Sequence, residues 1–192
     1  MAAEASVRLF ERIDRELWVV TAAAWGRRGG LIATFVSQAS IVPEMPRVLV
    51  GLAKHHHSWQ LVEKSRAFAL HLIGEDQLDW VWRFGLRSGR DGDKLDGLTI
   101  ETGPTGSPIL TDAPGWLDCR VEKSIDTGDR TIYLAEVVAS RLSSDRALLT
   151  VAQLRQRADA ERRVEMTHQR ESDSILDAEA IREWRRRAAG LV

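Results

Sequence analysis

A run of three histidines at residues 55–57 is the first feature of the sequence that could bind a metal ion or move a proton. Consecutive side chains on a strand or loop point in different directions, so three neighbouring imidazoles seldom reach one ion. Metal-binding histidine pairs on a helix stand four residues apart. Neither His71 nor His168 supplies that spacing. We therefore predict a polar loop here and no metal site.

Nucleophilic catalysis has little support in the sequence. The one cysteine, Cys119, stands in the alternating stretch WLDCRV, where a cysteine ordinarily acts as a small buried hydrophobic residue. The chain contains no Gly-x-Ser-x-Gly elbow, the usual sign of a serine hydrolase. The neighbouring carboxylates Glu75 and Asp76 lie in a loop-like stretch. The sequence predicts no hydrolase, and the catalytic residue is unknown.

Small and hydroxylated residues recur along the predicted strand at residues 31–40. Small side chains let a ligand approach the backbone, hydroxyl and amide groups can bond it, and a phenyl ring can pack against a ring system. The residues that could line such a groove are Ala33, Thr34, Phe35, Ser37, Gln38, Ala39 and Ser40. The same pattern also fits an exposed polar strand edge, so both interpretations stay open at this point.

A second set of polar residues follows the next predicted strand. Lys54, His57 and Ser58 place a cation, a titratable imidazole and a hydroxyl just before a predicted helix at residues 59–65. A cation beside a helix N-terminus is a good cradle for a phosphate group. A solvated loop is the alternative.

Composition narrows the class of protein. The chain has 192 residues, 27 Lys and Arg against 28 Asp and Glu, and a net charge of −1, which argues against nucleic acid as a partner. One cysteine excludes a disulfide framework. No apolar run approaches the roughly 18 residues that would span a bilayer, and the N-terminus mixes acidic and basic residues from Glu4 onward, unlike a secretory signal. We expect a cytoplasmic protein without membrane association.

Turn residues divide the chain in two. All five prolines and 13 of the 14 glycines precede residue 130, which predicts strands and loops first and helices last. The expected strands are 17–24, 31–40, 47–53, 67–73, 117–122 and 131–139, with a turn at 26–30 and helices at 10–16, 59–65 and 76–84. Without a βαβ rhythm, this pattern favours a β-barrel.

The last part of the chain reads as an appendage. Two apolar stripes at helical spacing lie after residue 146, with Ser174 as the expected N-cap of the last helix. We therefore expect a domain at residues 1–145 and a C-terminal helical extension at residues 146–192.

An ordered series of motifs gives these segments a family. The motifs are VVTA at 19–22, GLIATFVSQAS at 30–40, LVGLAK at 49–54, GDKLDG at 92–97, GSPIL at 106–110, PGWLDCRV at 114–121 and GDRTIYLAEV at 128–137. The set resembles the flavin reductase-like, FMN-binding split β-barrel family, and especially the branch found as a module of larger diflavin proteins. The resemblance implies a mainly β fold, a six-stranded Greek-key split barrel. It also implies a homodimer that binds FMN near its interface, NADH or NADPH as co-substrate, and a partner enzyme that accepts flavin.

Carried over by position, the resemblance assigns a flavin site. Ile32 begins the flavin strand, with Ala33, Thr34 and Phe35 along the isoalloxazine and ribityl. The rest of the groove would be formed by Ser37, Gln38, Ala39 and Ser40, with Lys54, His57 and Ser58 near the phosphate.

Three positions depart from the family pattern. Ile32 stands where threonine is frequent, and His71 where asparagine is common. Arg130 replaces the histidine of a Gly-Asp-His motif, and arginine cannot exchange a proton near neutral pH. Arg130 would instead hold a nucleotide phosphate or pair with Asp129 or Glu136.

The sequence thus predicts an FMN-dependent oxidoreductase. Two alternatives remain open: an FMN-binding module without NAD(P)H reductase activity, and a barrel that has lost flavin and acts through its helical tail.

Overall fold

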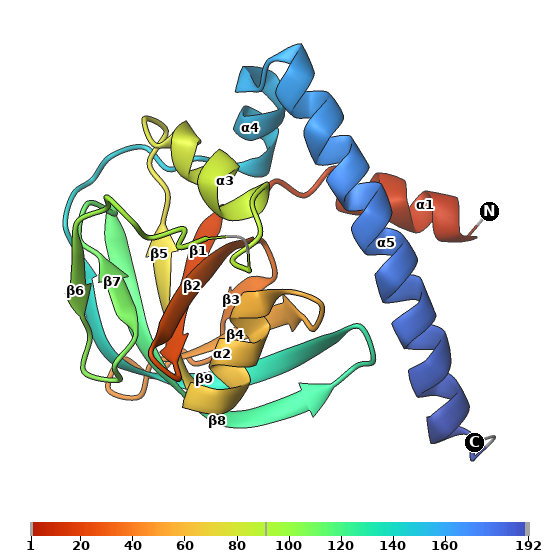
Figure 1. Ribbon diagram of the computed structural model, residues 1–192, viewed down its shortest axis with the longest axis horizontal. Helices are drawn as coiled ribbons and strands as arrows, with labels where there is room; N and C mark the ends of the chain where they lie inside the picture. The colour runs from red at the N-terminus through yellow and green to blue at the C-terminus, as the bar shows by residue number, and fades with distance from the viewer. Residues whose placement is uncertain (1, 91, 191–192) are drawn as a thin grey trace.

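Short apolar strands separated by tight turns fold into one strongly curled antiparallel sheet (Figure 1). The computed structural model describes residues 2–90 and 92–190. In spatial order, the sheet consists of β2 (Arg27–Ala33), β1 (Trp18–Ala24), β5 (Ala67–Leu72), β8 (Gly115–Asp126), β9 (Arg130–Leu142), β4 (Arg47–Ala53) and β3 (Val36–Gln38). A separate hairpin pairs β6 (Ile100–Thr102) with β7 (Pro108–Leu110). The predicted mainly β fold class is confirmed.

The two edge strands of this sheet are consecutive in the chain. β2 ends at Ala33 and β3 begins at Val36, so only Thr34 and Phe35 separate opposite edges. The sheet must therefore curl until its edges meet. The backbone N–H of Gly51 on β4 donates to the Phe35 carbonyl at 2.9 Å and extends the pairing of β3 with β4 to this connection.

This break explains why seven strands replace the six expected. The single strand predicted at residues 31–40 is divided at Thr34, and each half pairs with a different edge neighbour, β1 or β4. The turn expected at residues 26–30 is also shorter. It consists of Trp25 and Gly26, both at positive φ, the geometry of a two-residue hairpin turn.

Most other predicted elements are confirmed. β1, β4, β5, β8 and β9 lie where strands were expected, and so do α2 (His57–Ser65) and α3 (Leu78–Gly85). The β6–β7 hairpin was missed because its strands are only three residues long.

The position of the β6–β7 hairpin depends on the side chain of His71, which is fully buried. The Nδ1 atom of His71 lies 3.1 Å from the Val19 carbonyl, and its Nε2 accepts the Leu110 N–H at 3.0 Å.

The apolar residues form two clusters. One fills the barrel and includes Phe68, Cys119 and Tyr133, so the prediction that Cys119 is a buried hydrophobic residue is confirmed. The other lies under α3 and contains Phe84 together with Leu149 and Leu154. The segment after residue 145 therefore begins in contact with the barrel.

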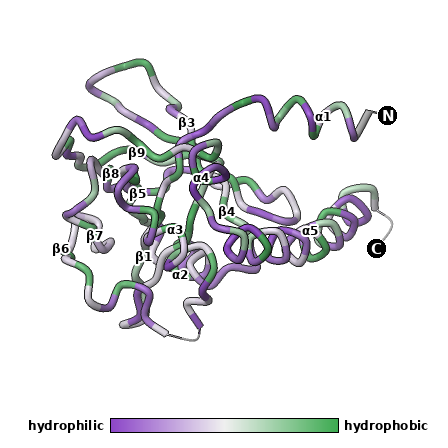
Figure 2. The backbone as a smooth tube through the Cα atoms, turned by 90° about the horizontal axis from the view of Figure 1, so that it is seen from above, coloured by the Kyte–Doolittle hydropathy of each residue, from purple (hydrophilic) through white to green (hydrophobic). Residues whose placement is uncertain are grey.

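The helical predictions at both ends need correction. The first helix, α1 (Ala2–Phe10), precedes the predicted range 10–16 and projects away from the barrel in both views (Figures 1 and 2). After α4 (Val151–Arg157), one long helix, α5, covers Ala160–Ala188. Its N-cap is Asp159, whose side chain accepts the Arg162 N–H, so Ser174 lies inside the helix. Among the described residues, no helix has both the length and the apolarity to cross a membrane.

Candidate functional site

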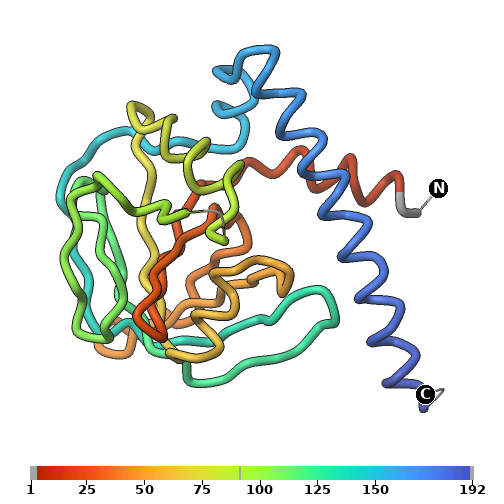
Figure 3. Tube along the Cα trace, viewed as in Figure 1, coloured from red at the N-terminus to blue at the C-terminus, as the bar shows by residue number. Residues whose placement is uncertain are grey.

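A cavity of about 620 Å³ lies between one face of the barrel and helix α5. Its barrel side is formed by the end of β2, by β4 and the loop after it, and by α3. Its other side is the middle of α5, which runs past the barrel in Figure 3 (blue). Volumes of 300–1,000 Å³ are typical of sites for small ligands and cofactors.

The barrel side of the cavity contains the break between β2 and β3. Ile32, Ala33, Thr34 and Phe35 all line it, so these four predicted residues share one site. The ring of Phe35 is 53% exposed and offers a flat apolar surface. Gly51 lies beside it, where a Cβ atom would stand 3.3 Å from the Phe35 Cβ and 3.1 Å from Ile132. Because Gly51 has no side chain, β4 can lie close to Phe35 and Ile132 at this point of the cavity wall.

Arg130 supplies a positive charge to this wall. Its guanidinium carbon lies 4.6 Å from the centroid of the Phe35 ring, within the range of a cation–π contact. The same group pairs with Asp129 at 2.5 Å and with Asp177 of α5 at 2.9 Å. The predicted pairing with Asp129 is confirmed, whereas Glu136 pairs with Arg120 instead.

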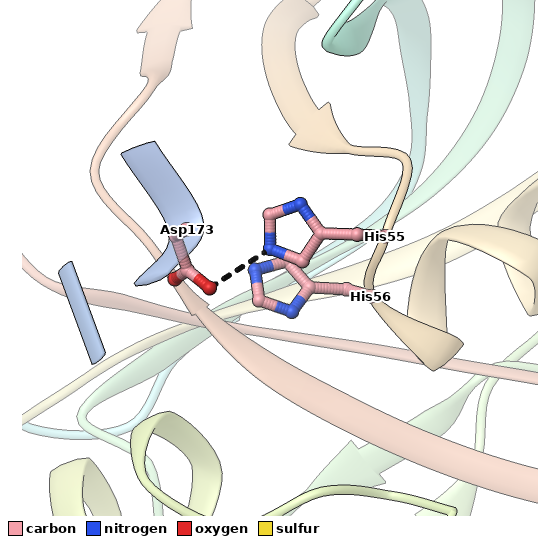
Figure 4. A group of neighbouring side chains, drawn as sticks. All are labelled: His55, His56 and Asp173. Atoms are coloured by element: carbon pink, nitrogen blue, oxygen red, sulfur yellow. Dashed lines mark ion pairs between the residues drawn. The ribbon is translucent and has the colours of Figure 1, made fainter. Parts of the chain in front are cut away.

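Two of the three adjacent histidines face α5 across the cavity (Figure 4). The rings of His55 and His56 lie side by side, with centroids 4.2 Å apart. His55 meets two carboxylates, with Nε2 3.2 Å from Asp173 and Nδ1 3.2 Å from Asp177. His57, the first residue of α2, points away from them and is buried near Gly29 and Gly89. The three imidazoles therefore do not converge, as expected, although His55 and His56 lie together.

Burial shapes the charges at this contact. Desolvation, with a smaller contribution from the neighbouring His55, lowers the pKa of His56 to about 4, so His56 is neutral at pH 7. Desolvation also raises the pKa of Asp177, and the nearby carboxylates of Asp129 and Asp173 act in the same direction. Arg130 and His55 oppose this rise. Three carboxylates, those of Asp129, Asp173 and Asp177, therefore lie close to Arg130 and His55.

Helix α5 rests on the barrel without burying a side chain. None of its residues, all of which the structure describes, is buried, and Figure 2 shows polar and apolar residues mixed along it. The helix also approaches Gly128 in the turn of the β8–β9 hairpin, where a Cβ atom would stand 2.8 Å from the Trp184 Cβ. Near its start, Met166 packs against the apolar cluster under α3, and Arg162 lies over the Trp82 ring. Ion pairs and these contacts hold α5 over the cavity.

The remaining residues predicted for the groove lie elsewhere. Ser37, Gln38 and Ser40 line a second cavity of about 640 Å³, together with Trp18 and Leu117. Ala39 donates its backbone N–H to the Arg47 carbonyl and continues the β3–β4 pairing. The structure thus divides the predicted groove into two at Val36.

The predicted phosphate loop is also divided. Lys54 pairs with Asp126 at 2.5 Å, while His57 and Ser58 are buried in the first turn of α2. The loop instead presents His55 and His56 to the cavity.

Five residues of the site were not selected from the sequence: these two histidines, Gly51, Asp173 and Asp177. The two aspartates carry a visible signal, since a spacing of four places them on one face of a helix. Nothing in the sequence shows which surface that face covers.

Comparison with known proteins identifies the family. Residues 10–158 match the family described as "Flavin reductase like domain". A ferric-chelate reductase (NAD(P)H) from Archaeoglobus fulgidus is 32% identical over 148 residues, which cover 76% of this chain and 86% of that protein. Diflavin flavoprotein A 1 from Synechocystis sp. is 30% identical over 141 residues, or 73% of this chain and 24% of that longer protein.

A solved structure supports the fold. The crystal structure of a flavin reductase domain protein from Arthrobacter sp. FB24 aligns with a TM-score of 0.70 at 24% identity, covering 79% of this chain and 91% of that one. The chain therefore belongs to the flavin reductase-like family, and it is an oxidoreductase that works with a flavin. The resemblance to the module of diflavin proteins is confirmed.

Proposed function

We propose that this protein binds FMN in the cavity between Phe35 and α5 and uses it to oxidise NADH or NADPH. The observation that carries the proposal is the wall formed by residues 32–35 beside Arg130, in a chain of the flavin reductase-like family. The similar protein from Archaeoglobus is named for reduction of a ferric chelate with NAD(P)H, and that name supports the choice of donor.

The residues of the cavity fit a flavin. Ala33, Gly51 and Phe35 give a thin, flat and apolar wall for a planar ring system. Thr34 adds a hydroxyl beside it, and Arg130 and Arg170 bring positive charge for a phosphate.

When bound, FMN would supply the acceptor for hydride from NADH or NADPH, chemistry that needs no side-chain acid or base. The chain would position the ring system. Residues 32–35 would lie along it, and Arg130 would balance negative charge on it. Helix α5 excludes water from the cavity, and it must move aside before a nicotinamide can reach the same space.

An anaerobic titration tests this proposal. Purified protein is mixed with FMN, and visible spectra are recorded before and after NADH and then NADPH. We expect a shifted flavin band that bleaches with one or both nucleotides. A spectrum identical to that of free FMN would overturn the proposal.

One observation favours a second candidate, an FMN-binding module without NAD(P)H reductase activity. Arg130 replaces the histidine that the family motif carries, and it is bound to Phe35, Asp129 and Asp177. A shifted flavin band that neither nucleotide bleaches would support this candidate.

The proposal extends to partners. We propose a homodimer, because the loop between β3 and β4 exposes Ile41 at 93% and Met45 at 61%, an apolar surface suited to a second copy. Electrons would then pass to a second flavin or a flavin-accepting enzyme in the cytoplasm, where nicotinamide nucleotides are available. Light scattering of the purified protein tests the dimer, and a monomer at micromolar concentration would overturn it.

A further inference from the structure

The contact between His55 and α5 balances as an ion pair only if the imidazole carries a proton on both nitrogens. Each nitrogen of this imidazole faces a carboxylate at 3.2 Å, Nε2 facing Asp173 and Nδ1 facing Asp177. A neutral imidazole has one N–H and can donate to only one of them. Its other nitrogen then turns a lone pair toward an anionic oxygen. A cation at Nε2 would remove that conflict.

The Nε2 atom of His55 is available for such a cation. It is buried, and within the described chain it has no hydrogen-bond partner, because its approach to Asp173 lacks hydrogen-bond geometry. His56 lies beside it, and one ligand atom from each of His55, His56 and Asp173 falls within 4.8 Å of the others (Figure 4). Zinc bonds of about 2.0–2.2 Å place tetrahedral ligand atoms about 3.4 Å apart, so small side-chain rotations would close the site.

We propose that His55, His56 and Asp173 bind a divalent metal ion of the zinc class, which clamps helix α5 to the barrel beside the flavin cavity. Two imidazoles and one carboxylate suit zinc and its neighbours, whereas calcium and magnesium prefer oxygen ligands. Three protein ligands leave one position open toward the cavity. This inference departs from the sequence-based expectation of a metal-free loop, and it does not depend on flavin binding.

The surroundings resemble the support that metal-bound histidines receive. A ligating histidine almost always gives its other ring nitrogen to a carboxylate or carbonyl, which orients the ring. Asp177 stands at Nδ1 of His55 in that role. Three carboxylates lie close to the cluster, those of Asp129, Asp173 and Asp177, and Arg130 pairs with the first and the last of them. The carboxylate of Asp173 is the one that Arg130 leaves for a metal ion.

The alternative to a metal ion at this contact is a second proton on His55. A proton on His55 would satisfy Asp173 and Asp177 without using His56. A metal ion would bind both imidazoles and the carboxylate of Asp173, so substitution of His56 should weaken metal binding.

Calorimetry on flavin-free protein without a polyhistidine tag tests the proposal directly. Zn²⁺ is titrated at pH 7.5, and Co²⁺ is added in parallel to record the visible bands of low-coordinate cobalt. We expect one ion per chain. His56→Gln and Asp173→Asn should each weaken binding at least tenfold, and Asp177→Asn by about 10–100-fold through the orientation of His55.

Matched controls keep the test specific to this cluster. His168→Gln and Glu179→Gln change an imidazole and a carboxylate at exposed positions of the same helix and should leave affinity unchanged. Added Zn²⁺ should also slow amide hydrogen exchange at residues 170–181 of wild type, but not of Asp173→Asn. The proposal is overturned if wild type binds no ion at micromolar concentration, or if the Asp173 and His56 variants bind as tightly as wild type. Because no flavin is present, either result leaves the flavin proposal untouched.

Discussion

Arg130 joins the barrel to helix α5 through two contacts of one guanidinium. The group lies over the Phe35 ring, 4.6 Å from its centroid, and pairs with Asp177 at 2.9 Å. None of the side chains of α5 is fully buried, and Met166 packs only partly buried against the cluster under α3. Charged contacts therefore contribute to the position of the helix, and the cavity beneath it should open when that charge is removed or screened.

Arg130→Gln should loosen α5. The substitution removes the stack on Phe35 and the pair with Asp177, so we expect amide hydrogen exchange at residues 170–181 to become several-fold faster. Raised salt should produce part of the same effect in wild type, because partly exposed ion pairs are screened. Arg120→Gln is the matched control, since it breaks an exposed pair with Glu136 far from α5. Equal exchange in all three proteins would contradict this account.

A substitution at Gly128 provides an independent test of the contact between α5 and the barrel. It adopts φ +97°, and a Cβ atom there would stand 2.8 Å from the Trp184 Cβ. Gly128→Ala should displace α5 and lower the free energy of unfolding by about 1–2 kcal/mol, of which backbone strain alone costs about 1.

Gly106 provides the control for that strain. Its φ is +88°, and no described atom lies within 4 Å of the Cβ position. Gly106→Ala should therefore cost the strain without speeding exchange in α5. Faster exchange at residues 180–184 in the Gly106 variant would show that the effect is not local to the helix contact.

The stability of the fold should fall with acid through His71. Burial lowers the pKa of this imidazole to about 4 from an ordinary value of 6.5, although its hydrogen bond to the Val19 carbonyl opposes part of the shift. The ring bridges Val19 and Leu110. Between pH 6.5 and 4 the unfolded chain binds a proton that the folded chain excludes. Stability is thus complete above pH 6.5 and declines toward pH 4, by about 3 kcal/mol for this group.

Urea unfolding at pH 7.5, 6, 5 and 4.5 measures that decline. His71→Asn keeps a donor and an acceptor but cannot titrate, so its free energy of unfolding should change less steeply with pH. Part of the slope should persist, because burial also lowers the pKa of His56 to about 4. Identical slopes in wild type and His71→Asn would exclude His71 as a cause.

The strands of the barrel could be predicted from local pattern, but their division could not. Apolar, β-branched runs gave β1, β4 and β5, since such residues suit a buried sheet. Thr34 and Phe35 are equally good strand residues, so nothing in the sequence marks the point where the chain leaves one edge of the sheet for the other. The passage of the chain from β2 to β3 at these two residues depends on closure of the whole barrel.

The candidate site was predictable only on its barrel side. Residues 32–35 combine small and aromatic side chains and could be selected by type. Asp173 and Asp177 lie more than 110 residues from His55 in the sequence, and only the docking of α5 brings them together. His57 was preferred to His55 and His56 because it lies nearest the helix start, yet the turn after β4 rotates it under α2.

A substitution at the break between β2 and β3 should decide which of the two cavities holds the flavin. Thr34 lines the cavity under α5, whereas Ser37 lines the second one. Thr34→Leu fills space beside Phe35 and should raise the Kd for FMN about tenfold or more, which is at least about 1.4 kcal/mol. Ser37→Leu adds the same bulk three residues away and should leave the Kd within about twofold. Quenching of FMN fluorescence measures both, after circular dichroism has shown that each variant is folded. If Ser37→Leu weakens binding and Thr34→Leu does not, the flavin belongs in the second cavity, and α5 covers some other ligand.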